Sequence, residues 1–126
     1  MRLRTLSYVT LFAVNFEEVK KLYRDTLGLP VAEENDNFIM FETEGSRLAF
    51  HRLKKAPPIE RPTVELHIGV RDVDDSFTAL QAKGVKFDEK PANHAWGTRS
   101  ASFRDPERYV VEIVGPLKQG EQVKGD

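Results

Sequence analysis

The feature that most constrains the fold is an internal duplication, because one pattern of apolar, polar and glycine positions occurs twice along the chain. A stretch over 54–62 that contains three prolines separates the two occurrences and predicts a linker. The halves are about 4–53 and 63–116. Their best overlay places residues 8–11 on 67–70, Leu22 on Leu80, Gly28 on Gly84 and 48–50 on 111–113.

Each half predicts a strand, a helix and then further strands. In the first half we expect strands over 6–12, 31–33, 38–42 and 47–53, with a helix that begins after Asn15 as N-cap and ends at Gly28. In the second half we expect strands over 64–70, 85–87, 98–104 and 109–114, with a helix from Asp72 to Gly84. The pattern predicts one α+β domain over 1–117, followed by a polar, disordered tail over 118–126.

Composition excludes several classes of function. The chain has 126 residues, and its 19 basic and 20 acidic side chains give a net charge of −1, so we expect neither nucleic acid nor membrane as a partner. Cysteine is absent, which excludes disulfides and thiolate chemistry. The N-terminus has no apolar signal core and the chain has no apolar run long enough for a membrane span, so we expect a cytoplasmic location.

Strand alternation predicts a polar cluster on one face of the second half. His67 shares a face with Glu65 and Gly69, and Glu112 is flanked by two valines, which favours a half-enclosed position for its carboxylate. The overlay adds Tyr8 and His51 from the first half to the same cup. Imidazole, carboxylate and phenol suit Zn²⁺, Ni²⁺, Fe²⁺ or Mn²⁺, and equally suit a polar ligand with no metal.

A loop near residue 96 carries further candidates for a substrate pocket. Trp96 is suited to stacking on a planar ligand or to covering the end of the core, and His94 is suited to proton transfer or hydrogen bonding. Arg99 is suited to pairing with an anionic substrate or to a structural salt bridge.

Two motifs carry a family resemblance over nearly the whole chain, from Leu6 to about Pro116. The residues 8–12 with 22–29, and the residues 96–106 running into 110–113, resemble a glyoxalase/bleomycin resistance/dioxygenase domain of the vicinal oxygen chelate superfamily. The resemblance implies two βαβββ modules whose mixed sheet curls around a cup, and two chains that pair as a homodimer. It also implies metal-ligand positions at Tyr8, Ala49, His67 and Glu112, of which only His67 and Glu112 match the family's ligands.

Two functions follow as expectations from this incomplete ligand set. One is a lyase, isomerase or dioxygenase that acts on a small molecule, with a divalent metal held by His67, Glu112 and His51 and with Glu112 as the catalytic proton carrier. The other is a metal-free binding protein of the bleomycin-resistance kind that sequesters a small molecule.

Overall fold

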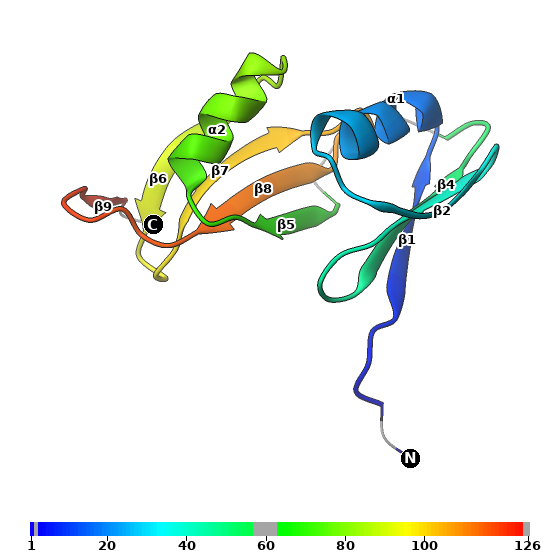
Figure 1. Ribbon diagram of the computed structural model, residues 1–126, viewed down its shortest axis with the longest axis horizontal. Coiled ribbons are helices and arrows are strands. Elements are labelled where there is room, and N and C mark those ends of the chain that lie inside the picture. Colours follow the sequence, from blue (N-terminus) through cyan, green and yellow to red (C-terminus); the bar gives the residue numbers. More distant parts are fainter. Residues whose placement is uncertain (2, 57–62, 125–126) are drawn as a thin grey trace. The chain divides into compact units, whose positions relative to one another are not determined.

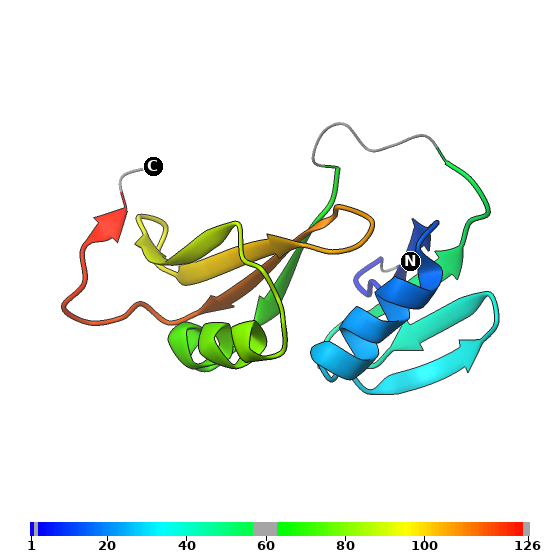
Figure 2. The same ribbon diagram turned by 90° about the horizontal axis from the view of Figure 1, so that it is seen from above.

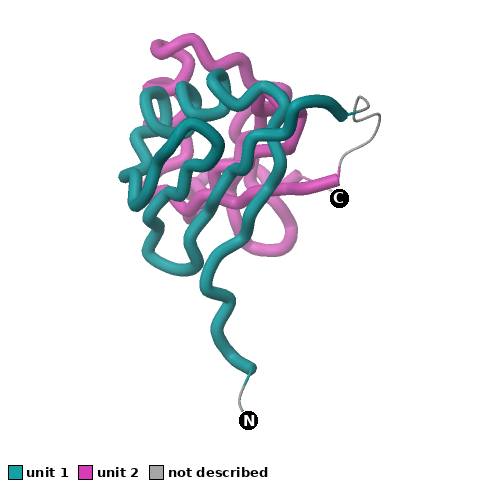
Figure 3. Tube along the Cα trace, turned by 90° about the vertical axis from the view of Figure 1, so that its right-hand side faces the viewer, with its two compact units in different colours: residues 1–58 teal, residues 59–126 magenta. Residues whose placement is uncertain are grey.

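The computed structural model describes residues 1, 3–56 and 63–124, and divides the chain into two compact units. Unit 1 spans Met1–Pro58 and unit 2 spans Ile59–Asp126 (Figure 3). The boundary falls within the expected linker over 54–62, of which residues 57–62 lie outside the described residues. Each unit contains one strand–helix–strand–strand–strand module, so the expected α+β class with two βαβββ modules is confirmed.

Unit 1 is a four-stranded mixed sheet with one helical segment. The elements are β1 (Tyr8–Ala13), α1 (Phe16–Lys20), the π-helix η1 (Lys21–Thr26), β2 (Val31–Asn35), β3 (Phe38–Phe41) and β4 (Arg47–Arg52) (Figure 1). The strand order is β1-β4-β3-β2, with β1 and β4 parallel and the other pairs antiparallel. The helical segment packs on this sheet through Tyr23, whose ring centroid lies 4.7 Å from that of Phe50 and 6.0 Å from that of Phe41.

The start of α1 differs from the sequence expectation. Asn15 has φ −90° and ψ 55°, and its side chain does not cap the helix. Glu17 and Glu18 in the first turn instead supply the negative charge that the exposed amides favour. The helix also widens into η1, where the Leu27 amide donates to the Leu22 carbonyl five residues earlier.

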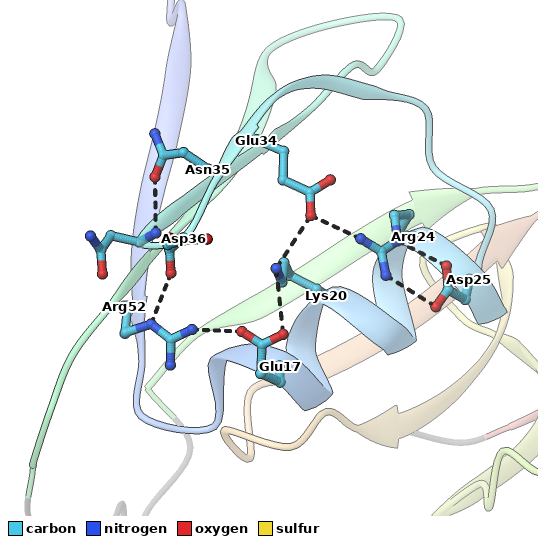
Figure 4. Close-up of polar contacts among 9 residues, drawn as sticks. Glu17, Lys20, Arg24, Asp25, Glu34, Asn35, Asp36 and Arg52 are labelled. Carbon is cyan, nitrogen blue, oxygen red and sulfur yellow. Dashed lines mark hydrogen bonds and ion pairs between the residues drawn. The ribbon is translucent and has the colours of Figure 1, made fainter.

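Charged side chains on the surface of unit 1 tie the helical segment to β2 and β4 (Figure 4). Glu34 on β2 accepts from Arg24 Nη1 at 2.9 Å and from Lys20 Nζ at 3.2 Å. Arg52 on β4 donates to Glu17 at 2.6 Å. The hydrogen bonds are exposed to solvent, so each pair contributes little stability and the network mainly orients the segment.

Unit 2 is a five-stranded mixed sheet covered on one face by a helix. The elements are β5 (Glu65–Gly69), α2 (Val73–Ala82), β6 (Glu89–His94), β7 (Arg99–Arg104), β8 (Val110–Gly115) and β9 (Val123–Lys124), in the sheet order β5-β8-β7-β6-β9 (Figures 1 and 2). The helix packs on β6, β7 and β8. Its N-cap is Asp72, as the sequence predicts, and the Asp72 carboxylate accepts from the Asp75 amide at 3.0 Å.

The expected strand over 85–87 is wrong, because these residues lead into a strand that begins at Glu89. Phe87 is used for packing: its ring lies 4.7 Å from that of Phe77 on α2 and 5.2 Å from that of Phe103 on β7. Sequence alternation does not distinguish an apolar residue in a short strand from one that fills the space between a helix and a sheet.

The C-terminal segment also differs from the expected disorder over 118–126. Residues 118–124 have a defined path, and β9 pairs in parallel with β6. Asn93 holds this segment: its amide group donates to the carbonyls of Lys118 and Glu121, and its side-chain oxygen accepts from the Lys118 amide at 2.9 Å. Residues 125 and 126 lie outside the described residues.

Strand register corrects the overlay of the two halves by two residues. His67 lies opposite Glu112 in the β5–β8 pair, whereas the residue opposite Ala49 in the β1–β4 pair is Thr10. Tyr8 lies opposite Arg47. The positions of the helices support the same correction, because α1 begins six residues after Thr10 and α2 begins six residues after His67. Thr10, rather than Tyr8, therefore occupies in unit 1 the place that His67 occupies in unit 2.

In the described part of the chain, every helix is too short or too polar to cross a bilayer.

Candidate functional site

A pocket of about 810 Å³ lies on the sheet of unit 2. Val110, Glu112 and Val114 of β8 line it, whereas the alternate residues Val111 and Ile113 are buried. Because Ile113 belongs to the core cluster that Val73 and Phe77 of α2 also form, strand alternation places the pocket on the face opposite the helix. The sequence prediction that Glu112 points into a half-enclosed space is confirmed for this unit.

Two carboxylates and one imidazole meet at one end of the pocket. His67 Nδ1 lies 3.8 Å from Glu112 Oε2, and His67 Nε2 lies 3.6 Å from Glu65 Oε1. Glu112 is the most covered of the three, with 14% of its side chain exposed, against 53% for Glu65 and 56% for His67. The three come from adjacent parallel strands, because β5 carries Glu65 and His67 and β8 carries Glu112.

Glu112 affects the ionisation of Glu65. A hydrogen bond with Glu112 raises the pKa of Glu65, and burial and the negative charge of Glu112 raise it further. Two carboxylates at hydrogen-bond distance repel each other when both are ionised. A cation bound between them would remove this repulsion.

The donor set fits a divalent metal. One ligand atom from each of Glu65, His67 and Glu112 lies within 4.8 Å of the others. Imidazole and carboxylate donors suit Zn²⁺, Mn²⁺, Fe²⁺ and Ni²⁺. Sequence reasoning placed Glu65 on the same face as His67 but did not choose it as a ligand. The signal was present in the i, i+2 spacing of Glu65 and His67 on one strand.

His94 and Trp96 line the same pocket at the β6–β7 turn. That these residues contact a substrate stays a prediction. Their rings are stacked, with centroids 4.3 Å apart and planes 3° from parallel. His94 is buried and its Nε2 lies 2.8 Å from Ser100 Oγ. Trp96 remains 62% exposed, and its Nε1 donates to Thr98 Oγ1 at 2.7 Å.

Arg99 forms a structural salt bridge. This is one of the two roles that the sequence left open, and the other was pairing with an anionic substrate. Arg99 does not line the pocket and is only 4% exposed. Its guanidinium donates to both carboxylate oxygens of Asp74, at 2.8 and 2.9 Å, and lies 3.1 Å from Glu121. These contacts lower the pKa of Asp74 and raise that of Arg99. Arg99 therefore joins α2, β7 and the C-terminal segment.

Three cationic residues that line the pocket were missed by sequence reasoning: Arg104, Arg108 and Lys124. Lys124 lies on β9, within a segment for which the sequence predicted disorder. Arg108, in the turn before β8, has φ +69°, a backbone conformation that costs a residue with a side chain about 1 kcal/mol. Asp105 holds that turn by accepting from the amides of Glu107 and Tyr109.

The two remaining candidates, Tyr8 and His51, belong to unit 1. The His51 ring lies near the rings of Phe12 and Phe38, and its Nδ1 lies 3.0 Å from the Arg52 carbonyl oxygen. Tyr8 is half-exposed on β1. Participation of either residue in a site with His67 and Glu112 stays a prediction.

Comparison with known proteins gives consistent matches over most of the chain. Residues 5–113 match the family model of the Glyoxalase/Bleomycin resistance protein/Dioxygenase superfamily. A protein of Bacillus subtilis (strain 168) named "Uncharacterized protein YraH" is 30% identical, with 89% of this chain and 98% of that protein covered. Among solved structures, a glyoxalase/bleomycin resistance protein/dioxygenase from Nocardioides has a TM-score of 0.79 at 21% identity, covering 100% of this chain and 92% of that one. Lactoylglutathione lyase from Agrobacterium tumefaciens has a TM-score of 0.73 at 19% identity, covering 96% of this chain and 100% of that one.

Proposed function

The chain belongs to the glyoxalase/bleomycin resistance protein/dioxygenase superfamily, and from this premise we propose that it is a small-molecule enzyme that uses a divalent metal. The reaction class that fits is a lyase, isomerase or dioxygenase step. The residues that would hold the metal are Glu65, His67 and Glu112 of unit 2.

One observation carries this proposal: two carboxylates and an imidazole converge inside a pocket of small-molecule size. The pocket volume of about 810 Å³ lies within the range of ligand sites. Glu112, the most covered of the three groups, is flanked by Val110 and Val114, which also line the pocket and partly shield it from water. Such shielding strengthens the interaction of the carboxylate with any cation or proton beside it.

The metal, when bound, would supply Lewis acidity toward an oxygen atom of the substrate. The protein's own groups would handle the proton. Glu112 is placed to accept a substrate proton at a carboxylate oxygen and to return it. Val110 and Val114 would limit the access of water to that proton.

A second candidate function is metal-free binding of a small molecule. The stacked pair of His94 and Trp96 favours it, because an exposed indole can hold a planar compound without any chemistry. The cationic groups of Arg104 and Arg108 in the same pocket would add affinity for an anion.

Metal analysis separates the two functions. The protein is purified without an affinity tag, its bound metals are measured, and its melting temperature is followed while Zn²⁺, Ni²⁺, Mn²⁺ or Fe²⁺ is added. The metal enzyme requires bound metal, or a melting temperature that rises with metal concentration. Absence of both would leave the binding protein as the function.

The three histidines of the chain provide matched variants. His67→Ala should abolish the metal-dependent rise in melting temperature. His94→Ala removes an imidazole from the same pocket but outside the cluster and should leave the rise in place. His51→Ala tests the ligand expected from unit 1: loss of metal binding in this variant would support His51 as a ligand.

The assembly and location remain proposals of the same kind. We expect a homodimer in the cytoplasm, since family members often pair. Sedimentation of the full chain at micromolar concentration should give about twice the mass of 14.4 kDa. A single species at the mass of one chain would contradict the homodimer.

A further inference from the structure

Two arginines at the turn between β7 and β8 line the pocket without an acidic partner. Arg104 is the last residue of β7, and Arg108 lies in the turn that follows it (Figure 1). Among the residues that the structure describes, no carboxylate lies within ion-pair distance of either guanidinium. Both positive charges are therefore available to a ligand in the pocket.

The fold holds these two arginines next to each other. Arg104 Nη1 donates to the Arg108 carbonyl oxygen at 3.1 Å. The turn itself is fixed from inside by Asp105, which is only 4% exposed and accepts from the amides of Glu107 and Tyr109 at 2.8 and 2.9 Å. Two like charges are thus kept close together, and an anion between them would be attracted by both.

The backbone of Arg108 is a second and independent sign of a binding role. Its φ is +69°, and every other positive φ in the described part of the chain belongs to a glycine. A side chain in this conformation lowers stability relative to glycine, and such strained residues cluster at ligand-binding sites. A guanidinium that binds a ligand accounts for an arginine at a position whose backbone favours glycine.

Strand register places the arginine pair beside the acidic cluster but apart from it. Arg104 of β7 lies opposite Val110 of β8, which lies opposite Glu65 of β5. Val110 therefore separates Arg104 from Glu65 within this row. Glu112 lies opposite Ser102, two residues before Arg104, and a strand advances about 3.4 Å per residue, so the two rows are about 7 Å apart.

The third cation of the pocket lies at the other end of the sheet. Lys124 of β9 lies opposite His94 of β6, and the His94 amide donates to the Thr98 carbonyl at 2.8 Å. Thr98 precedes Arg104 by six residues along β7, which corresponds to about 20 Å. Lys124 therefore shares the pocket with the arginine pair but lies too far away to bind the same small group.

We propose that Arg104 and Arg108 form a subsite for an oxyanion group, a carboxylate or a phosphoryl group, and that the ligand of this pocket is an anionic small molecule. The planar fork of a guanidinium matches the geometry of both groups and binds them through charge-assisted hydrogen bonds. The inference rests on the arginine pair and the pocket alone. It therefore holds for a metal-dependent enzyme and for a metal-free binding protein alike.

Three small probes of similar length test the subsite: butanoate, propylphosphonate and the neutral butanamide. Each is titrated into the isotope-labelled full chain near neutral pH, at constant ionic strength and in the presence of EDTA, and binding is followed by nuclear magnetic resonance. At least one anion should bind about 10-fold more tightly than butanamide and should shift the side-chain Nε–H signals of Arg104 and Arg108. The anion that binds more tightly identifies the group as a carboxylate or a phosphoryl group.

Variants assign the preference to the two guanidiniums. Arg104→Gln and Arg108→Gly should each weaken anion binding about 5- to 10-fold and leave the affinity of butanamide unchanged. Arg108→Gly also relieves the backbone at φ +69°, so its melting temperature should stay the same or rise, and weaker binding could not be ascribed to unfolding. Lys124→Gln, which removes a cation from the same pocket, should keep the preference for the anion.

Three results would overturn the inference. Butanamide could bind as tightly as both anions, or the arginine variants could leave the affinity of the anions unchanged. Lys124→Gln could also weaken anion binding as much as the arginine variants do, which would indicate general attraction by the pocket and no defined subsite.

The test is independent of the proposed metal-dependent function, because EDTA is present throughout. A chain that binds no metal but prefers anions through Arg104 and Arg108 would keep the subsite and lose the metal-dependent function. A chain that binds metal but shows no preference for anions would keep that function and lose the subsite.

Discussion

Replacement of Arg99 by methionine should lower the free energy of unfolding by about 2 kcal/mol while the metal-dependent rise in melting temperature persists. The Arg99 guanidinium makes two charge-assisted hydrogen bonds to Asp74, and such bonds contribute about 1.5–3 kcal/mol each when buried. Two facts make the expected loss of stability smaller than the sum of two such bonds. The side chains of Asp74 and Glu121 are 38% and 41% exposed, so both carboxylates regain water in the variant. Asn93 keeps its hydrogen bonds to the C-terminal segment.

The assay is urea-induced unfolding followed by far-ultraviolet circular dichroism, with Arg24→Met as the matched control. Arg24 also contacts two carboxylates, Asp25 and Glu34, but on the exposed surface of unit 1, so its replacement should have a clearly smaller effect. If Arg99→Met and Arg24→Met shift the unfolding midpoint equally, the structural role of Arg99 is refuted. Loss of ligand binding by Arg99→Met with no loss of stability would instead restore the substrate-pairing alternative.

The same variant has a predicted pH dependence. The hydrogen bonds from Arg99 lower the folded-state pKa of Asp74 below its usual value of 3.8. A depressed carboxylate pKa contributes stability above the unfolded-state pKa, and this contribution is lost as the pH falls through the folded-state pKa. The stability gap between wild type and Arg99→Met should therefore be constant from pH 7 to about pH 5 and narrow below the usual pKa of an aspartate. A gap that widens on acidification would contradict the assigned ion pair.

Three further predictions concern the framework of unit 2. Gly115→Ala should destabilise the chain by about 1–3 kcal/mol in urea unfolding, because the added Cβ would lie 2.8 Å from the Val70 carbonyl oxygen; an unchanged midpoint would show that β8 can shift there. Asp72→Ala should remove the N-cap of α2 and cost about 1 kcal/mol, whereas Asp72→Asn should retain most of the stability, and equal losses in both would contradict capping. Asn93→Leu should release the segment that carries β9, which is checked by faster hydrogen exchange or proteolysis of that segment with the β7–β8 amides still protected.

Much of the fold was predictable from local pattern. Alternation in β5 and β8 predicted which face carries His67 and Glu112, and Asp72 predicted the start of α2. These predictions succeed because side-chain direction along a strand and capping at a helix end depend on neighbouring residues only. The prediction of a strand over 85–87 was wrong because Phe87 packs against Phe77 and Phe103, which are distant from it in sequence.

The sequence predicted which types of residue form the candidate site, but it did not predict the full set of residues. The sequence selected His67, Glu112, His94 and Trp96, and all four line one pocket. Glu65 was not among them, because strand alternation gives the face that a side chain occupies but not its distance from a residue on another strand. Strand register was needed to show that the overlay was displaced by two residues.

By itself, the sequence determined the duplicated α+β framework and its family, and it predicted the polar faces on which His67 and Glu112 lie, since each depends on residue type and on spacing along the chain. Only the tertiary structure decided that Glu65 joins that pair, that Arg99 is a buried ion-pair partner, and that the segment over 118–124 reaches the pocket through Lys124. The physical reason is that these three outcomes depend on which strands are adjacent and in what register. A shift of two residues in the pairing of β5 with β8 would separate His67 from Glu112 without any change in sequence pattern.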